Sequence, residues 1–161
     1  MRSEIVIQST LGFEFAVGQN LLIINPGQNA KDLNLQRLLC STKAHSTVSI
    51  DGQDSSDFKV NRLAKISDAE LGRAKGGLLA IASHNGYEAS HGIIHHRKLY
   101  LSTGGGNLRG SDHLEYTGAP GEIARMAVVR FHLHPRVTAA MLNAHTINAL
   151  SSLRAEPMCE R

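Results

Sequence analysis

Apolar residues alternate with polar or small residues along much of this chain, and the alternating segments are short. The pattern is clearest at residues 11–17, where every odd position is apolar. A period of two places successive side chains on opposite faces of a strand, so that one face can be buried while the other meets water. Glycine-rich clusters such as 103–107 separate the segments. Short, closely spaced strands with such turns predict an all-β fold, an antiparallel β-sandwich, rather than alternating strand and helix units.

The expected strands follow from the same alternation. They cover residues 11–17, 21–24, 45–50, 78–84, 93–97, 99–102, 108–110 and 126–134. Residues 30–39 carry four leucines and are expected to form a connector with at most a short helical turn. After Val137 neither alternation nor turn chemistry continues, so the pattern assigns no fold to this tail.

Composition excludes several classes of protein. Lys+Arg 17 against Asp+Glu 14 gives a net charge of +3 with no long basic run, and aromatic residues make up 4% with no Trp, so no nucleic-acid partner is expected. The longest apolar runs fall far short of the ~18–20 residues that span a bilayer. Cys40 and Cys159 lie far apart and predict no disulfide framework. Residues 1–4 lead directly into the alternating pattern, so no secretory signal is expected.

Histidine is unusually frequent, with nine residues, and two of them stand close together on an expected strand. His132 and His134 would share one strand face with Arg130. Such a pair offers two ligands to zinc, but a catalytic zinc needs three protein ligands and a structural zinc four, and the pattern identifies no third. The alternative is that both imidazoles hydrogen-bond to neighbouring strands.

A second group of polar residues spans 83–87 and 94–97. It brings His84 and Tyr87 close to His95, His96 and Arg97, and the group could supply a base, an acid and a guanidinium that binds a carboxylate. The alternative is two adjacent strands with polar faces. The glycines at 104–106 precede no helix pattern, which excludes a phosphate cradle, and the chain lacks the G-x-S-x-G elbow of serine hydrolases.

Taken together, residues 43–51, 83–101 and 129–135, with Leu108-Arg109-Gly110-Ser111-Asp112, resemble the C-terminal β-sandwich domain of the heparinase II/III-like polysaccharide lyases. The resemblance runs from about Leu11 to about Val137. It implies a partial sandwich domain over 1–137, followed by a tail over 138–161.

The resemblance also implies a function. Lyases of this family cleave uronic-acid polysaccharides by β-elimination, in a cleft between the sandwich and an α/α toroid that supplies most catalytic groups. The chain has no room for the toroid, so we expect it to be inactive alone. The chain would then be either the remnant of a longer enzyme or the partner of a separately encoded toroid. Its other implied partner is an acidic polysaccharide, and the implied location is the periplasm or cell envelope. A non-catalytic carbohydrate-binding or interaction module is the alternative.

The family's site residues can be carried over by position. The catalytic candidates are His45, Tyr87 and His95, and the carbohydrate-binding candidates are His45, Tyr87, His95 and Arg97. The resemblance places the family's zinc ligands near Ile7, Asn25 and His45, and a further sandwich histidine near Ile5. Since one ligand of three remains, His45 is expected to bind metal weakly at best, as are His132 and His134, and no cofactor is expected.

Overall fold

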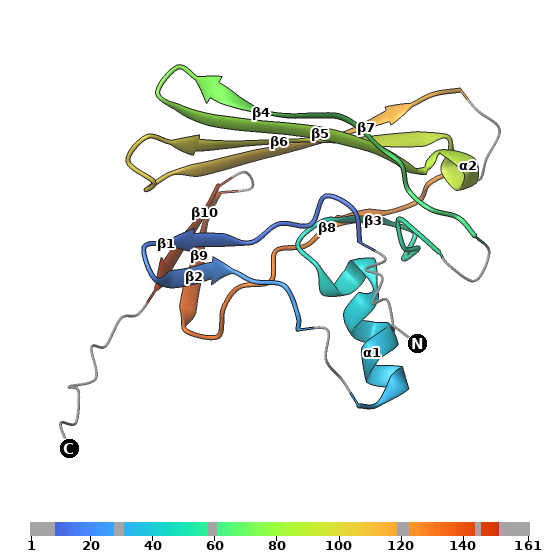
Figure 1. Ribbon diagram of the computed structural model, residues 1–161, viewed down its shortest axis with the longest axis horizontal. Coiled ribbons are helices and arrows are strands. Elements are labelled where there is room, and N and C mark those ends of the chain that lie inside the picture. The colour runs from blue at the N-terminus through green and yellow to red at the C-terminus, as the bar shows by residue number, and fades with distance from the viewer. Residues whose placement is uncertain (1–8, 28–30, 58–60, 119–122, 144–145, 152–161) are drawn as a thin grey trace, which may run out of the picture.

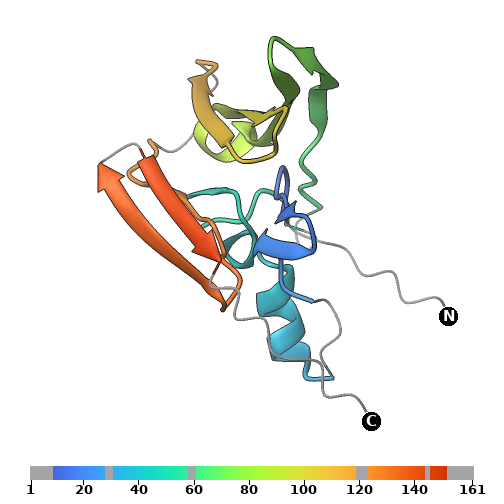
Figure 2. The same ribbon diagram turned by 90° about the vertical axis from the view of Figure 1, so that its left-hand side faces the viewer.

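The computed structural model describes residues 9–27, 31–57, 61–118, 123–143 and 146–151, and there the chain forms two layers of antiparallel β-structure (Figure 1). One layer is a four-stranded sheet in the order β4-β5-β6-β7. The pairs β1–β2, β3–β8 and β9–β10 lie on one side of it, as the turned view also shows (Figure 2). The predicted all-β antiparallel sandwich is therefore confirmed.

The elements, in chain order, are β1 (Phe15–Val17), β2 (Asn20–Ile23), α1 (Leu33–Cys40), the 3-10 turn η1 (Thr42–Ala44), β3 (Val48–Ile50), β4 (Ile66–Ala74), β5 (Gly77–Tyr87), α2 (Glu88–His91), β6 (Ile93–Ser102), β7 (Leu108–Tyr116), β8 (Ala127–Val129), β9 (Val137–Asn143) and β10 (Thr146–Ser151).

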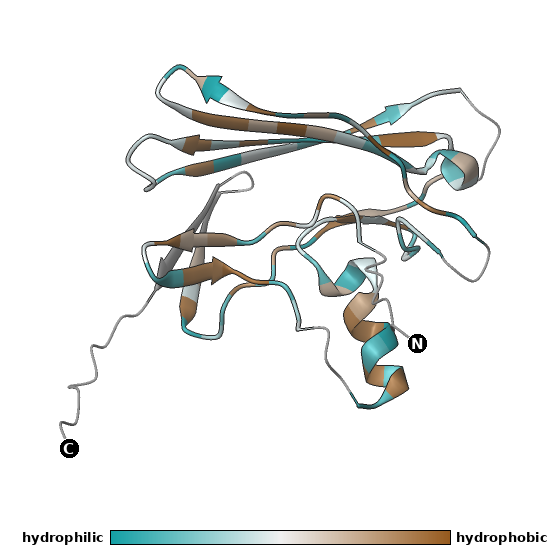
Figure 3. Ribbon diagram, viewed as in Figure 1, coloured by the Kyte–Doolittle hydropathy of each residue, from teal (hydrophilic) through white to brown (hydrophobic). Residues whose placement is uncertain are grey.

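The apolar core between the layers is small. It consists of Val48 and Ile50 of β3, Tyr87 of β5 and Ile93 of β6, with Leu114 and Ala124 packed against them. Figure 3 shows apolar residues along the middle of β5 and along β2. Most other buried side chains are polar, namely Thr10, Thr42, His45, Ser46, Thr47, Ser49, Ser55, Ser56, Ser83, His84, His91, His95 and Arg97. The interior must therefore be held by hydrogen bonds as well as by apolar contact.

Segment 31–40 contains a helix where the pattern indicated a connector. The Asp32 carboxylate accepts hydrogen bonds from the backbone N–H groups of Asn34 and Leu35 at 2.6 and 3.1 Å, which caps the first turn of α1. Leu33 and Leu38 are 71% and 66% exposed. The leucines of α1 do not form a buried stripe, so their spacing gave only a weak indication of a helix. The Asp32 cap fixes where the helix starts.

Several strands differ in extent from their predicted bounds. Strand β4 was missed because its nine residues hold few apolar side chains and nearly all are exposed; backbone pairing with β5 forms it. Strand β6 joins the two segments predicted at 93–97 and 99–102. The predicted strand 126–134 stops at Val129, since the chain then bonds to Thr47 through Arg130 and to β2 through His134. Strands β9 and β10 form a hairpin in the segment to which the pattern assigned no fold.

Within the described residues, no helix is both long enough and apolar enough to cross a membrane.

Tyr87→Phe tests the polar part of this core. The Tyr87 hydroxyl donates to the Val48 carbonyl at 2.8 Å and the residue is 0% exposed. Losing the donor leaves a buried carbonyl short of a partner, so the free energy of unfolding should fall by about 1–2 kcal/mol in urea titration. The matched control is Tyr116→Phe, because Tyr116 is 70% exposed; it should change stability by less than about 0.5 kcal/mol. Equal effects of the two variants would contradict a structural role for the Tyr87 hydroxyl.

Candidate functional site

The register of the four-stranded sheet places a row of polar side chains on its inward face. His95 of β6 pairs with His84 of β5, and Arg97 of β6 pairs with Asp112 of β7. Because side chains alternate along a strand, His95 and Arg97 share the inward face with Ile93. The side chains of His95 and Arg97 are 0% and 4% exposed. The polar face that the sequence indicated therefore points into the molecule.

A directed chain of hydrogen bonds runs through the two histidines. The backbone N–H of Gly86 donates to His84 Nδ1 at 3.0 Å, so His84 carries its proton on Nε2. His84 Nε2 then donates to His95 Nδ1 at 3.0 Å, and His95 Nε2 donates to Asp112 Oδ1 at 2.7 Å. The hydrogen-bond pattern thus assigns both imidazoles to the neutral tautomer with the proton on Nε2.

Arg97 connects the two layers. Its Nε and Nη2 donate to Asp112 Oδ1 and Oδ2 at 2.7 and 3.0 Å, a bidentate pair. Its Nη1 donates to the carbonyls of Ser46 and Leu11 at 2.7 and 2.9 Å, and both carbonyls lie outside the four-stranded sheet. The guanidinium carbon also lies 5.5 Å from the ring centre of Phe13. One side chain therefore uses its donors to join β6, β7 and the opposite layer.

This environment shifts the pKa values of Asp112 and His84. Burial would raise the pKa of Asp112, but the hydrogen bonds from His95 and Arg97 and the charge of Arg97 outweigh it and hold the pKa at about 2. For His84, burial is the main cause and the positive charge of Arg97 adds to it, which lowers the pKa to about 3. Asp112 is therefore charged and His84 neutral near neutral pH.

Tyr87 lies at the end of β5 and donates its hydroxyl proton to Val48, as described above. Burial raises the pKa of this phenol well above its ordinary value, with Asp54 contributing to the rise. Its ring centre lies 5.6 Å from that of His84. The structure thus brings Tyr87, His84, His95 and Arg97 into one buried region, with their donors committed to internal partners.

His45 lies apart from that region, 3% exposed at the end of η1. Its Nδ1 donates to the Ser41 carbonyl at 2.8 Å. A Cβ atom on Gly12 would lie 3.1 Å from Ser9 Oγ, 3.4 Å from His45 Cβ and 3.9 Å from Asn25 Oδ1, so these three side chains surround one point. Ser9 Oγ and Asn25 Oδ1 are buried and have no hydrogen-bond partner among the described residues.

This donor set does not fit the zinc that the resemblance implies. It offers one imidazole, one neutral amide and one hydroxyl, whereas zinc sites in proteins use imidazole, thiolate and carboxylate. Over the described part of the chain, no three or more His, Cys, Asp or Glu side chains gather closely enough to hold a metal ion. Ile5 and Ile7, the other positions carried over from the family, lie outside the described residues.

His132 and His134 have separate partners. His132 Nε2 donates to the Lys43 carbonyl at 2.9 Å, and His134 Nδ1 accepts from the backbone N–H of Arg136 at 3.2 Å. The side chain of Arg130, expected on the same face, donates to Ser49 Oγ at 2.6 Å instead. Because the strand ends at Val129, the alternation that would align these three side chains does not continue past it.

Two members of the buried network, His84 and Asp112, are not among the predicted site residues, although His84 lies in the polar group that the sequence indicated. Both lie in segments that carried the family resemblance, so a signal was present. These two residues meet His95 only because of the register in which β5, β6 and β7 pair. The sequence pattern did not fix that register. On the opposite face of the same sheet, His96 bridges Ser83 Oγ and Glu115 Oε2 at 2.7 and 2.8 Å. Ser83 is 1% exposed, so this cluster offers no accessible nucleophile.

Comparison with known proteins gives one match. The family model described as "Heparinase II/III-like, C-terminal" matches residues 8–156, which covers β1 through β10. No curated protein and no solved structure matches the chain. The predicted resemblance is therefore confirmed at the level of the family.

The pKa of His84 predicts how stability depends on pH. Because the folded-state pKa is depressed from 6.5 to about 3, the contribution is complete above pH 6.5 and is lost as pH falls toward 3. Over the first two pH units of that range, His84 should account for a loss of about 2–3 kcal/mol in the free energy of unfolding.

His84→Gln should flatten this part of the curve, since glutamine stays neutral and can still donate to His95. The matched control, His113→Gln, removes an exposed imidazole from β7 and should keep the wild-type pH dependence. Urea titrations at a series of pH values measure both. A wild-type slope in His84→Gln would contradict the assignment.

Proposed function

We propose, because the chain belongs to the heparinase II/III-like family as its C-terminal domain, that it is the β-sandwich part of a polysaccharide lyase. In this proposal the domain binds uronic-acid polysaccharide and meets an α/α toroid domain at the cell envelope or in the periplasm. The domain contributes a surface that binds the polysaccharide, and it does not contribute the acid–base groups of the reaction.

The burial of the candidate catalytic groups is the observation that carries this proposal. β-Elimination needs a base that reaches the proton beside the carboxylate and an acid that reaches the leaving oxygen. Tyr87 and His95 are both 0% exposed, and their protons are held by Val48 and Asp112. A polymer cannot touch these atoms while the layers stay packed. Their burial supports a structural role for them in this chain.

The same burial bears on the predicted carbohydrate contacts. His45, Tyr87, His95 and Arg97 are 3%, 0%, 0% and 4% exposed. Direct contact of a saccharide with these four side chains stays a prediction that would require the layers to open. Saccharide binding on the outer surface needs no such opening, and we favour it.

The alternative of an interaction module has one observation in its favour. Leu33, Leu35 and Leu38 of α1 are 71%, 48% and 66% exposed. Apolar side chains gathered on a surface helix are typical of contacts with another protein. This alternative predicts no affinity for uronates, which distinguishes it from the lyase domain.

Activity of the isolated chain tests the proposal. Because the candidate acid–base groups His45, Tyr87 and His95 are buried, it should release no unsaturated uronate from alginate-type or heparan-type polymers, followed by ultraviolet absorbance. A characterised uronate lyase acting on the same polymers serves as the positive control. Product formation that disappears in Tyr87→Phe or His45→Ala would contradict the proposal.

Zinc content gives an independent test of the donor set around His45. We expect substoichiometric zinc after dialysis of the purified chain against a mild chelator, because an amide and a hydroxyl are poor partners for this ion. Elemental analysis measures it. One zinc per chain, retained in the wild type and lost in His45→Ala, would contradict the expectation.

A further inference from the structure

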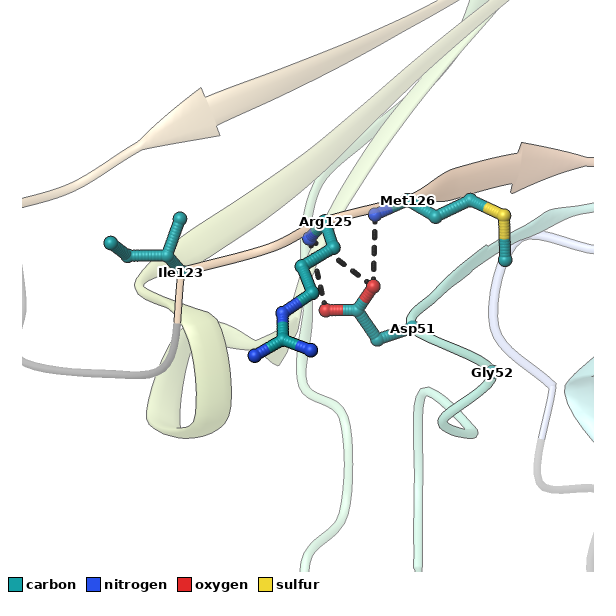
Figure 4. Close-up of a pocket in the computed structure, with 5 residues that line it drawn as sticks. All are labelled: Asp51, Gly52, Ile123, Arg125 and Met126. Carbon is teal, nitrogen blue, oxygen red and sulfur yellow. Dashed lines mark hydrogen bonds between the residues drawn. The ribbon is translucent and has the colours of Figure 1, made fainter.

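A pocket of about 920 Å³ opens at the end of the sandwich near α2, away from the buried network (Figure 4). Asp51 and Gly52 line one wall, directly after β3, and Ile123, Arg125 and Met126 line the other, directly before β8. Figure 4 shows the Arg125 side chain between Ile123 and Asp51. Two segments far apart in the sequence therefore form one surface site.

Backbone hydrogen bonds hold the acidic wall in place. The Asp51 carboxylate accepts from the backbone N–H of Arg125 at 3.2 and 3.1 Å and from that of Met126 at 2.8 Å. The bond from Arg125 is the largest cause that keeps the pKa of Asp51 below its ordinary value, and the nearby His91 also lowers it. His91 Nε2 lies 3.3 Å from Asp51 Oδ2. The negative charge of Asp51 is therefore partly compensated within the protein.

Two cationic side chains are relevant to this site: Arg125 lines the pocket, and Lys43 lies against Gly52 of its wall. Neither Arg125 nor Lys43 has an ion pair among the acidic groups of the described ranges. Lys43 Nζ lies 3.2 Å from the point that a Cβ on Gly52 would occupy, beside the pocket wall. A guanidinium binds a carboxylate through two parallel hydrogen bonds. The Arg125 guanidinium at the pocket is thus free of an ion pair within these ranges, while the Asp51 carboxylate beside it is held by backbone N–H groups.

Apolar surface lies next to this charge. Ile123 and Met126 are 90% and 58% exposed, although both are large apolar residues. A pyranose ring has apolar C–H faces and a polar rim, so it can cover such side chains while its substituents reach polar groups. Exposed apolar residues beside a guanidinium match a sugar ring that carries a carboxylate better than they match a free inorganic anion.

We propose that this pocket binds one uronate residue of an acidic polysaccharide. The inference rests on the proposed function and names the place where the domain would bind the polymer. The uronate carboxylate pairs with the Arg125 guanidinium, with Lys43 adding positive charge. The ring packs on Ile123 and Met126. A ring hydroxyl donates to the Asp51 carboxylate, whose two oxygens keep acceptor capacity beside their backbone bonds.

Arg125→Ala tests the pocket without removing the bonds that shape it, because Arg125 holds Asp51 through its backbone N–H and not its side chain. Calorimetric titration of the full chain with an unsulfated alginate-type tetrasaccharide should show binding that falls about tenfold or more in this variant. The matched control is Arg109→Ala, an exposed arginine of β7 outside the pocket, which should bind as the wild type does. Unchanged thermal midpoints verify that both variants fold.

The other outcomes separate the two claims. Wild-type binding that Arg125→Ala leaves unchanged overturns the pocket and leaves the proposed function standing. Absence of uronate binding by the wild type overturns both. Equal binding of a neutral tetrasaccharide of the same linkage, or binding of a sulfated tetrasaccharide alone, also overturns the carboxylate contact and hence the pocket.

Discussion

The ion pair of Arg97 and Asp112, whose side chains are 4% and 15% exposed, is the interaction on which the rest of this structure depends. With a small apolar core, the two layers have limited contact area to hold them together, and Arg97 reaches across to the carbonyls of Ser46 and Leu11. Leu11 has a φ of 59°, a conformation that costs a non-glycine residue of order 1–3 kcal/mol and persists where surrounding contacts fix it. Removing one partner of a buried ion pair costs about 3–5 kcal/mol, because the other charge is left uncompensated.

The same network also occupies the polar atoms of the two buried histidines. His84 donates a hydrogen bond to His95, and His95 donates one to Asp112. Each ring nitrogen of the two histidines therefore already has a partner. A general base must have a lone pair that a substrate can reach, and a general acid must have a proton to give to it. In this domain those lone pairs and protons are used to satisfy buried polar groups. Contacts with a ligand would have to come from exposed groups, such as Arg125 beside Asp51.

The sequence allowed the sandwich and most of its strands to be predicted, because period-2 alternation depends on local geometry that a strand keeps in any sheet. It also placed Tyr87, His95 and Arg97 in one polar group. It did not show which face is buried, because β6 carries polar residues on both faces and hydropathy cannot separate them. Strand β4 was missed since sheet pairing, not apolar content, forms it. The early end of β8 was missed because hydrogen bonds to Thr47 and β2 redirect the chain after Val129.

The tautomers of His84 and His95 test the central claim most directly, and long-range proton–nitrogen correlation spectra of the imidazole rings can measure them near neutral pH. The structure predicts that both rings are neutral with the proton on Nε2, since the Gly86 N–H fixes His84 and His84 in turn fixes His95. A proton on Nδ1 of either ring, or averaged signals typical of exposed imidazoles, would contradict a fixed buried network and return both residues to the set of accessible acid–base groups.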